Sequence, residues 1–147
     1  MSFEPEIIKG RPPNFEAIAA VFPLARRMSV AFAYGDVIYV PTGDDLPPKL
    51  YAHETVHCVR QKEIGVEEWW RRYLEDPTFR YYEELLGHRA EYKWLELHAR
   101  NRQERRGALE HTAKRLTAKL YEYGVPLARA KRDLVDDGGT EVMPVHG

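Results

Sequence analysis

The sequence predicts a single α+β domain that is mostly helical, with a small β-hairpin or sheet packed on a central helix. Two runs rich in β-branched and aromatic residues, 28–34 and 37–40, lie on either side of Gly35-Asp36, which is a hairpin pattern. From residue 48 onward, apolar residues recur instead at the spacing of helices. The 147 residues, of which 44% are hydrophobic, suffice for one such domain with its own core.

The first part of the chain predicts the short elements. Residues 1–13 are polar and end in two prolines, so we expect an extended lead-in without a regular element. Asn14 suits the N-cap of a short helix that Pro23 ends. Gly35 can adopt the positive φ of a type I′ or II′ turn between the two predicted strands.

The next part predicts two helices that follow each other directly. The first covers about 48–63, begins at two prolines and stops near Gly65. The second covers about 66–75 and contains Trp69 and Trp70. Adjacent residues cannot both be buried on one face of a helix, so we expect one tryptophan to line a cleft or a partner surface.

Three further helices are expected. Asp76 and Pro77, an N-cap residue followed by proline in the first turn, predict a long helix to about residue 100. Another is expected from beyond Gly107 to Tyr123, and a short one after Pro126.

Several further features of the sequence limit the class of protein. We expect residues 1–135 to form the domain and the polar, glycine-rich residues 136–147 to form a flexible C-terminal tail. The chain does not open with a signal-peptide pattern and has no apolar run of membrane-helix length, so we expect a cytoplasmic location without a membrane partner. Delivery inside a phage particle fits the same features. Cys58 is the single cysteine, which excludes an internal disulfide and a thiolate metal cluster.

Charge gives no strong indication of a partner. The formal net charge is −1, although residues 100–132 contain ten Lys or Arg and three Glu. Neither interleaved aromatic residues nor a glycine-rich loop accompanies these basic residues. We therefore interpret them as solvated helices that balance an acidic remainder, and we do not expect a nucleic-acid partner.

The chemistry is concentrated in the motif His53-Glu54-Thr55-Val56-His57. Histidines four residues apart project from one face of a helix and can both bind a single Zn²⁺. Glu54 lies close to that face and can act as general base for a zinc-bound water. The other face, with Ala52, Val56 and Val59, is expected to pack the helix into the core.

Residues 50–61, which carry this motif, resemble the active-site helix of the zincin metallopeptidases. The resemblance extends schematically over residues 28–100, and the size of the chain is similar to compact minimal zincins, including phage and bacterial members. It implies a zinc-dependent hydrolase that cleaves a peptide bond. The substrate would be a protein, a short peptide or a peptidoglycan stem peptide. In this superfamily a strand precedes the helix along the substrate cleft, and residues 37–40 match it.

The third zinc ligand has to come from elsewhere in the chain. Arg60 and Glu63 stand where the metzincin pattern needs glycine and histidine, so that branch is excluded. The gluzincin branch takes a glutamate from a later helix, which makes Glu84 the leading candidate by resemblance. Gly87 then allows a close approach of the helices, and His88 replaces the usual aspartate. The alternatives for the ligand, taken from the same segment, are His88, Glu91 and Glu83.

Other side chains of this segment can assist the reaction. His88 can orient a ligand or stabilise an oxyanion, and Tyr81 and Tyr92 flank the same face and can donate to that oxyanion. For both tyrosines the other interpretation is a core or rim aromatic residue. A different function is also compatible with the motif: a non-catalytic, zinc-stabilised binding protein or phage structural component.

Overall fold

Helices dominate the structure, a computed structural model that describes residues 3–27, 30–117 and 125–135. They hold 68% of these residues beside one three-stranded mixed sheet, which confirms the predicted fold class. In chain order the elements are β1 (Glu6–Lys9), α1 (Phe15–Val21), the 3₁₀ helix η1 (Pro23–Arg26), β2 (Phe32–Tyr34), β3 (Val37–Val40), α2 (Pro48–Ile64), α3 (Val66–Glu75), α4 (Pro77–His98), α5 (Arg102–Leu116) and α6 (Leu127–Val135). None of the helices in the described part of the chain is long and apolar enough to span a membrane.

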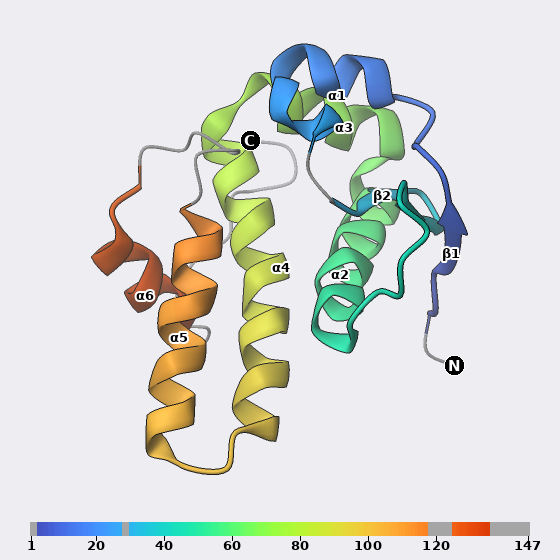
Figure 1. Ribbon diagram of the computed structural model, residues 1–147. Coiled ribbons are helices and arrows are strands. Elements are labelled where there is room, and N and C mark those ends of the chain that lie inside the picture. Colours follow the sequence, from blue (N-terminus) through green and yellow to red (C-terminus); the bar gives the residue numbers. More distant parts are fainter. Residues whose placement is uncertain (1–2, 28–29, 118–124, 136–147) are drawn as a thin grey trace.

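The elements stack side by side around α4. Helix α2 lies between the sheet and α4, and α5 and α6 pack on α4 from other sides (Figure 1). Helices α1, η1 and α3 share one apolar cluster with β2 at the end of the molecule where α4 begins. The motif helix α2 is therefore enclosed between the sheet and a long helix.

The sheet has the order β1-β3-β2. β2 and β3 form the predicted antiparallel hairpin, with Gly35 at a φ of +64° in its turn. β1 pairs parallel with β3, Glu6 opposite Val37, so the expectation of no element within residues 1–13 is wrong. A four-residue edge strand is stabilised by a partner distant in sequence, and no local pattern signals it.

The expected role of residues 37–40 beside a substrate cleft also needs correction. They form β3, the central strand, and both edges of β3 are paired. An extended peptide can add only to an edge strand. In this sheet the edge on the side of α2 belongs to β2.

Gln61 attaches the hairpin to α2. Its amide nitrogen donates to Ala33 O at 2.9 Å, and its carbonyl oxygen accepts from Gly35 N at 2.7 Å. Gln61 is fully buried, and its bond to Ala33 is shielded from water. The predicted packing of a β-hairpin on the motif helix is thereby confirmed.

Local residues mark several helix boundaries. Gly65, at a φ of +105°, ends α2, and the Asp76 carboxylate accepts from Thr78 N and Phe79 N at the start of α4, as predicted. Asn14 precedes α1 as expected, but its side chain makes no capping hydrogen bond.

Helix α5 begins earlier than predicted. Its first residue is Arg102, because Asn101 accepts from Glu104 N at 2.9 Å and caps the helix. Gly107 therefore lies inside α5 instead of before it. The predicted end at Tyr123 and the predicted flexible tail 136–147 lie outside the described residues, whereas the short helix after Pro126 is confirmed as α6.

Candidate metal centre

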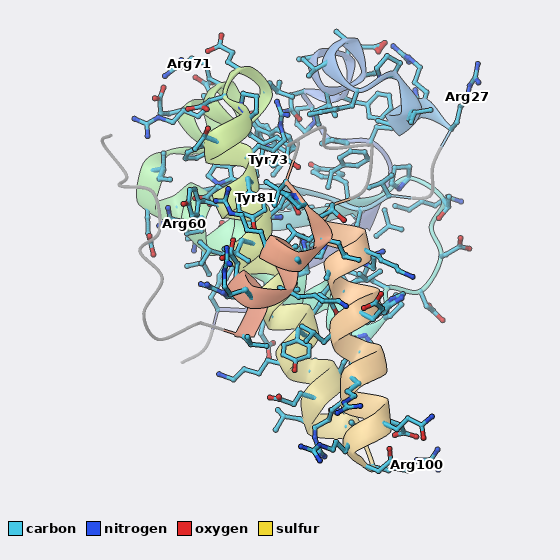
Figure 2. The ribbon with its side chains drawn as sticks, turned by 90° about the vertical axis from the view of Figure 1, so that its left-hand side faces the viewer. Arg27, Arg60, Arg71, Tyr73, Tyr81 and Arg100 are labelled. Carbon is cyan, nitrogen blue, oxygen red and sulfur yellow. The ribbon has the colours of Figure 1, made fainter. Side chains whose placement is uncertain are left out.

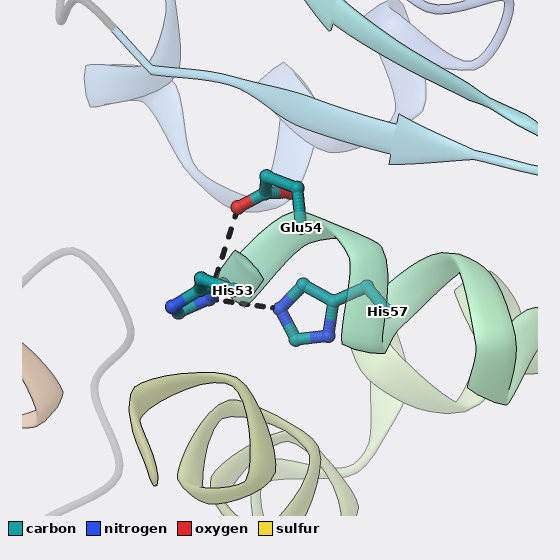
Figure 3. Close-up of side chains that lie close together, drawn as sticks. All are labelled: His53, Glu54 and His57. Carbon is teal, nitrogen blue, oxygen red and sulfur yellow. Dashed lines mark hydrogen bonds and ion pairs between the residues drawn. The ribbon is translucent and has the colours of Figure 1, made fainter. Parts of the chain in front are cut away.

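The histidine face of α2 is buried. His53 and His57 are each 3% exposed, and their rings lie between α2 and α4 (Figure 3). Val59 is 38% exposed, and Ala52 and Val56 are only half-buried. The expectation that Ala52, Val56 and Val59 pack the helix into the core is therefore wrong. Helix α4 covers the histidine face instead, with polar side chains of its own.

Potential ligand atoms of three side chains, from two helices, lie close together. His53 Nε2 lies 3.0 Å from His57 Nε2 and 2.9 Å from Glu84 Oε1. His57 Nε2 lies 3.2 Å from Glu84 Oε2. Tetrahedral zinc with bonds of about 2.0–2.2 Å places neighbouring ligand atoms roughly 3.3–3.6 Å apart, slightly wider than these spacings. The structure thus brings Glu84, the leading candidate for the third ligand, to both imidazoles at a spacing that suits one small cation.

Glu91 holds the far side of the His53 ring. His53 Nδ1 lies 2.5 Å from Glu91 Oε2, and Arg115 of α5 donates to Glu91 Oε1 at 3.1 Å. With a carboxylate as its partner, Nδ1 carries the proton of the neutral ring. Nε2, which faces Glu84 and His57, is then the atom that can bind a cation in place of a second proton. Glu91, an alternative ligand by sequence, therefore lies behind His53.

His88 lies against the same ring. Its Nδ1 donates to the carbonyl oxygen of Glu84 at 2.8 Å, and its ring centroid lies 4.5 Å from that of His53. Its Nε2 lies 3.4 Å from Glu91 Oε2. Burial, helped by the charge of His53, lowers the pKa of His88 to about 4. Two groupings within the described residues have ligand atoms close enough for one metal ion: His53, Glu54 and His57, and His53, Glu84 and His88. His88 therefore belongs to the centre.

Gly87 makes room for the His53 ring. A Cβ at residue 87 would lie 2.7 Å from His53 Nε2 and 2.8 Å from His53 Cδ2, closer than real Cβ contacts. The predicted role of Gly87 in the close approach of the two helices is confirmed.

Burial and charge act against each other in this cluster. Burial raises the pKa of Glu84, but His57 and His53 outweigh it and hold that pKa well below its ordinary value. Burial likewise disfavours a charged His53, yet Glu84, Glu91 and Glu54 hold the pKa of His53 well above its ordinary value. A positive charge, carried by a proton or by a cation, is therefore strongly favoured between the three carboxylates.

Glu54 lies on the opposite side of the histidines from α4, toward the sheet (Figure 3). Its Oε2 is 3.7 Å from His53 Nε2, and its side chain is 13% exposed. Burial raises the pKa of Glu54, and His53 and His57 offset part of this rise. Glu54 is thus close to the ligand atoms without a hydrogen bond to them among the contacts of the described residues.

The tyrosines are placed differently from expectation. Tyr81 points toward α6, where its hydroxyl donates to Asp133 at 2.6 Å (Figure 2). The Tyr92 hydroxyl donates to Glu96 at 3.3 Å, and Tyr92 lines a surface cavity with residues of α6. Both expectations of an oxyanion donor are therefore corrected. Tyr92 follows Glu91 by one residue, which turns it about 100° away from the centre.

Tyr73 is a contact of the centre that the sequence did not indicate. Its hydroxyl donates to Glu84 Oε2 at 2.6 Å, and its side chain is buried. It comes from α3, and no spacing rule connects a residue of one helix with a glutamate of the next. Only the packing of α3 against α4 reveals it.

Glu83, the last alternative ligand, serves a different network. Its carboxylate accepts from the Arg60 guanidinium at 2.9 Å and from Trp69 Nε1 at 2.9 Å. These bonds lie on the side of Glu83 that faces α2 and α3. The charge of Glu83 is thereby balanced without a metal.

An apolar cavity opens beside Glu54 and His57. Side chains of α1, η1, β2 and α3 line it, with both Trp69 and Trp70 among them. Both tryptophans line this cavity, where we expected one of them to line a cleft or a partner surface. Both are also buried, with Trp69 1% and Trp70 8% exposed. Helix α3 is covered by α4 on the side of Trp69 and by β2 on the side of Trp70, where Trp70 Nε1 donates to Ala33 O.

Comparison of the chain with protein-family models, with curated proteins and with solved structures gives no match. The resemblance to the zincins therefore stays a prediction, and the function has to be argued from the geometry and chemistry of the centre.

Proposed function

We propose that the chain is a zinc-dependent hydrolase, a peptidase, in which His53, His57 and Glu84 hold the metal and Glu54 is the general base. The observation that carries this proposal is the convergence of His53 Nε2, His57 Nε2 and the Glu84 carboxylate within 2.9–3.2 Å of one another. Carboxylate and imidazole lone pairs repel at such distances unless a proton or a cation lies between them.

The donor set fits zinc better than calcium or magnesium. Two imidazoles and one carboxylate are a known set for catalytic zinc, whereas calcium and magnesium prefer oxygen ligands throughout. Glu91 behind His53 adds the hydrogen-bonded carboxylate that zinc-binding histidines usually have. Bound zinc supplies a Lewis acid that polarises a carbonyl oxygen and acidifies water.

Glu54 has the properties of a proton carrier at this site. It lies next to the ligand atoms and at the rim of the apolar cavity, and its pKa is raised by burial. A carboxylate with a raised pKa can take a proton from attacking water at Oε2 and pass it to a leaving amine. Tyr73 and Glu91 keep Glu84 and His53 in place while this happens.

Metal content and turnover test the proposal together. Elemental analysis of the purified full chain should give about one zinc per chain, lost in His53→Ala and in Glu84→Ala. Glu54→Gln should retain zinc and lose hydrolysis of a peptide mixture. No zinc after reconstitution, or unchanged hydrolysis in Glu54→Gln, contradicts the assignment.

Burial favours a second candidate, a non-catalytic protein that zinc stabilises. The side chains of His53, His57 and Glu84 are only 3–4% exposed, as in closed structural sites. In that case a chelator lowers the unfolding temperature, but hydrolysis is absent in wild type and in Glu54→Gln alike. Glu54-dependent hydrolysis excludes this candidate.

A further inference from the structure

Trp69 of α3 contacts two side chains of the centre. Its ring centroid lies 5.2 Å from that of His57, and the two rings are tilted by 55°. The Tyr73 ring stacks on the same indole at 4.9 Å with an interplanar angle of 18°, and the Tyr73 hydroxyl donates to Glu84. One buried indole therefore touches a proposed zinc ligand and the hydrogen-bond partner of another.

The His57 imidazole lacks the support that His53 has. His53 Nδ1 is held by the Glu91 carboxylate, whereas His57 Nδ1 is buried and has no hydrogen-bond partner among the described residues. Zinc-binding histidines usually donate the proton of this nitrogen to an acceptor, which fixes the orientation of the ring. In the described part of the chain the His57 ring contacts two other rings, those of His53 and Trp69, and of these only Trp69 is not itself a proposed ligand.

A buried ion pair holds the indole in turn. Trp69 Nε1 donates to Glu83 Oε1 at 2.9 Å, and Glu83 is fully buried. The Arg60 guanidinium reaches both oxygens of this carboxylate, with Nε 3.1 Å from Oε1 and Nη2 2.9 Å from Oε2. Such two-pronged pairing fixes the relative orientation of the two groups. The indole therefore has a fixed acceptor at its N–H edge.

This ion pair belongs to the two helices that carry the ligands. Arg60 follows His57 by three residues on α2, and Glu83 directly precedes Glu84 on α4. Trp69 closes the circuit from α3 through its contact with the His57 ring. A displacement of the ion pair therefore moves the indole, and the indole moves the imidazole.

We propose that Trp69 is a positioning residue for His57, and that the Arg60–Glu83 pair holds Trp69 in this role. The inference rests on the proposed function. Packing against the indole limits rotation of the imidazole, so Nε2 stays directed at the Glu84 carboxylate. Less conformational freedom is then lost when the metal binds, which strengthens binding.

Zinc affinity of the full chain, measured by competition with a chromophoric chelator, tests this role. Trp69→Leu should weaken zinc binding at least about tenfold, and Trp69→Phe, which restores an aromatic ring, should recover part of the loss. Trp70→Leu is the matched control. Trp70 is the neighbouring buried indole and also donates its N–H, to Ala33 O, but its ring contacts in the described residues are with Trp69 and Tyr73 and not with His57.

Trp70→Leu should lower the unfolding temperature and leave zinc affinity at the wild-type value. Equal losses of zinc affinity in Trp69→Leu and Trp70→Leu would show that the indoles support the fold in general, and this overturns the positioning role.

A second matched pair tests the ion pair. Glu83→Gln should also weaken zinc binding, because an amide cannot accept from both arms of the guanidinium. Glu63→Gln is the control, since Glu63 accepts from Arg60 at 3.0 Å but is 53% exposed. Wild-type zinc affinity in Glu83→Gln overturns the part assigned to the Arg60–Glu83 pair.

Ring orientation in the zinc-free chain separates this inference from the proposed function. In the NMR spectrum, NOEs from the two carbon-bound ring protons of His57 report which way the ring faces. Wild type and Trp70→Leu should show one orientation, and Trp69→Leu should show averaging over several. If wild type binds no zinc, the proposed function fails. Averaging in Trp69→Leu then still supports the positioning role, and an unchanged orientation overturns it.

Discussion

Gly87 lies so close to the His53 ring that a Cβ at residue 87 would be 2.7 Å from His53 Nε2. The proposed ligand atom is therefore held in a space that the absence of a side chain on α4 creates. A glycine in α4 therefore determines where a metal-binding imidazole of α2 can lie.

Gly87→Ala should displace the His53 ring and weaken zinc binding by at least about tenfold, because catalytic and ligand geometry tolerates little error. Zinc affinity is measured by competition with a chromophoric chelator. Gly107→Ala is the control, because Gly107 lies inside α5 with nothing within 4 Å of its Cβ position. Alanine at this helical position should raise the free energy of unfolding by about 0.5–1 kcal/mol. Equal zinc affinities of wild type and Gly87→Ala contradict the prediction.

Glu91→Gln should weaken zinc binding about 10–100-fold, since a neutral amide orients the His53 imidazole and raises its basicity less than a carboxylate. The same chelator competition measures it. Glu96→Gln, on the exposed part of the same helix, should bind zinc like wild type. A Glu91→Gln variant with wild-type affinity would show that the hydrogen bond has no part in metal binding.

His88 should make zinc-free protein sensitive to mild acid. Its folded-state pKa is lowered to about 4, so between pH 6.5 and 5 the unfolded chain binds a proton that the folded chain does not. The free energy of unfolding should therefore fall by about 1 kcal/mol per pH unit as the pH decreases through this window.

The raised pKa of His53 does not produce this fall. Its stabilising contribution is fully present below pH 6.5 and is lost only as the pH rises through its folded-state pKa. Urea unfolding at several pH values tests the prediction. His88→Gln should remove most of the slope, and His98→Gln, at the exposed end of the same helix, should keep it. A slope that persists in His88→Gln assigns the effect to another group.

Zinc should stabilise the fold by binding between α2 and α4. At a free zinc concentration a hundred times the dissociation constant, the free energy of unfolding should rise by about 2.7 kcal/mol. Thermal unfolding with increasing zinc measures this, and magnesium is the ionic control. His57→Ala should abolish the zinc response. A zinc response that survives in His57→Ala places the metal elsewhere.

Much of the fold could be predicted because several helices begin and end at residues with strong local preferences. Gly65 and Asp76 end and restart helices through their own backbone and side-chain preferences. The sequence also contains a signal for the start of α5, since Asn101 and Glu104 have the spacing of an N-cap residue and an acidic residue three positions later. Strand β1 was not, because its partner is distant in sequence.

The centre was predictable in part for the same reason. His53, Glu54 and His57 share one helix, so their spacing alone relates them. Glu84 could be proposed from its own segment, but only the packing of α4 on α2 brings it to both imidazoles. Tyr73 comes from a third helix and has no signal in any single segment.

The sequence by itself determined which side chains can bind a metal and which of them share a helical face, because helical periodicity is a property of one segment. The tertiary structure decided which face is covered. The histidine face of α2 is buried and Val59 is exposed, since α4 supplies Glu84 and Glu91 as partners for His53 and Gly87 as the space for its ring. Buried polar groups on α2 are stable only when α4 supplies hydrogen-bonding or charged partners for them. Those partners come into place only when the two helices pack together.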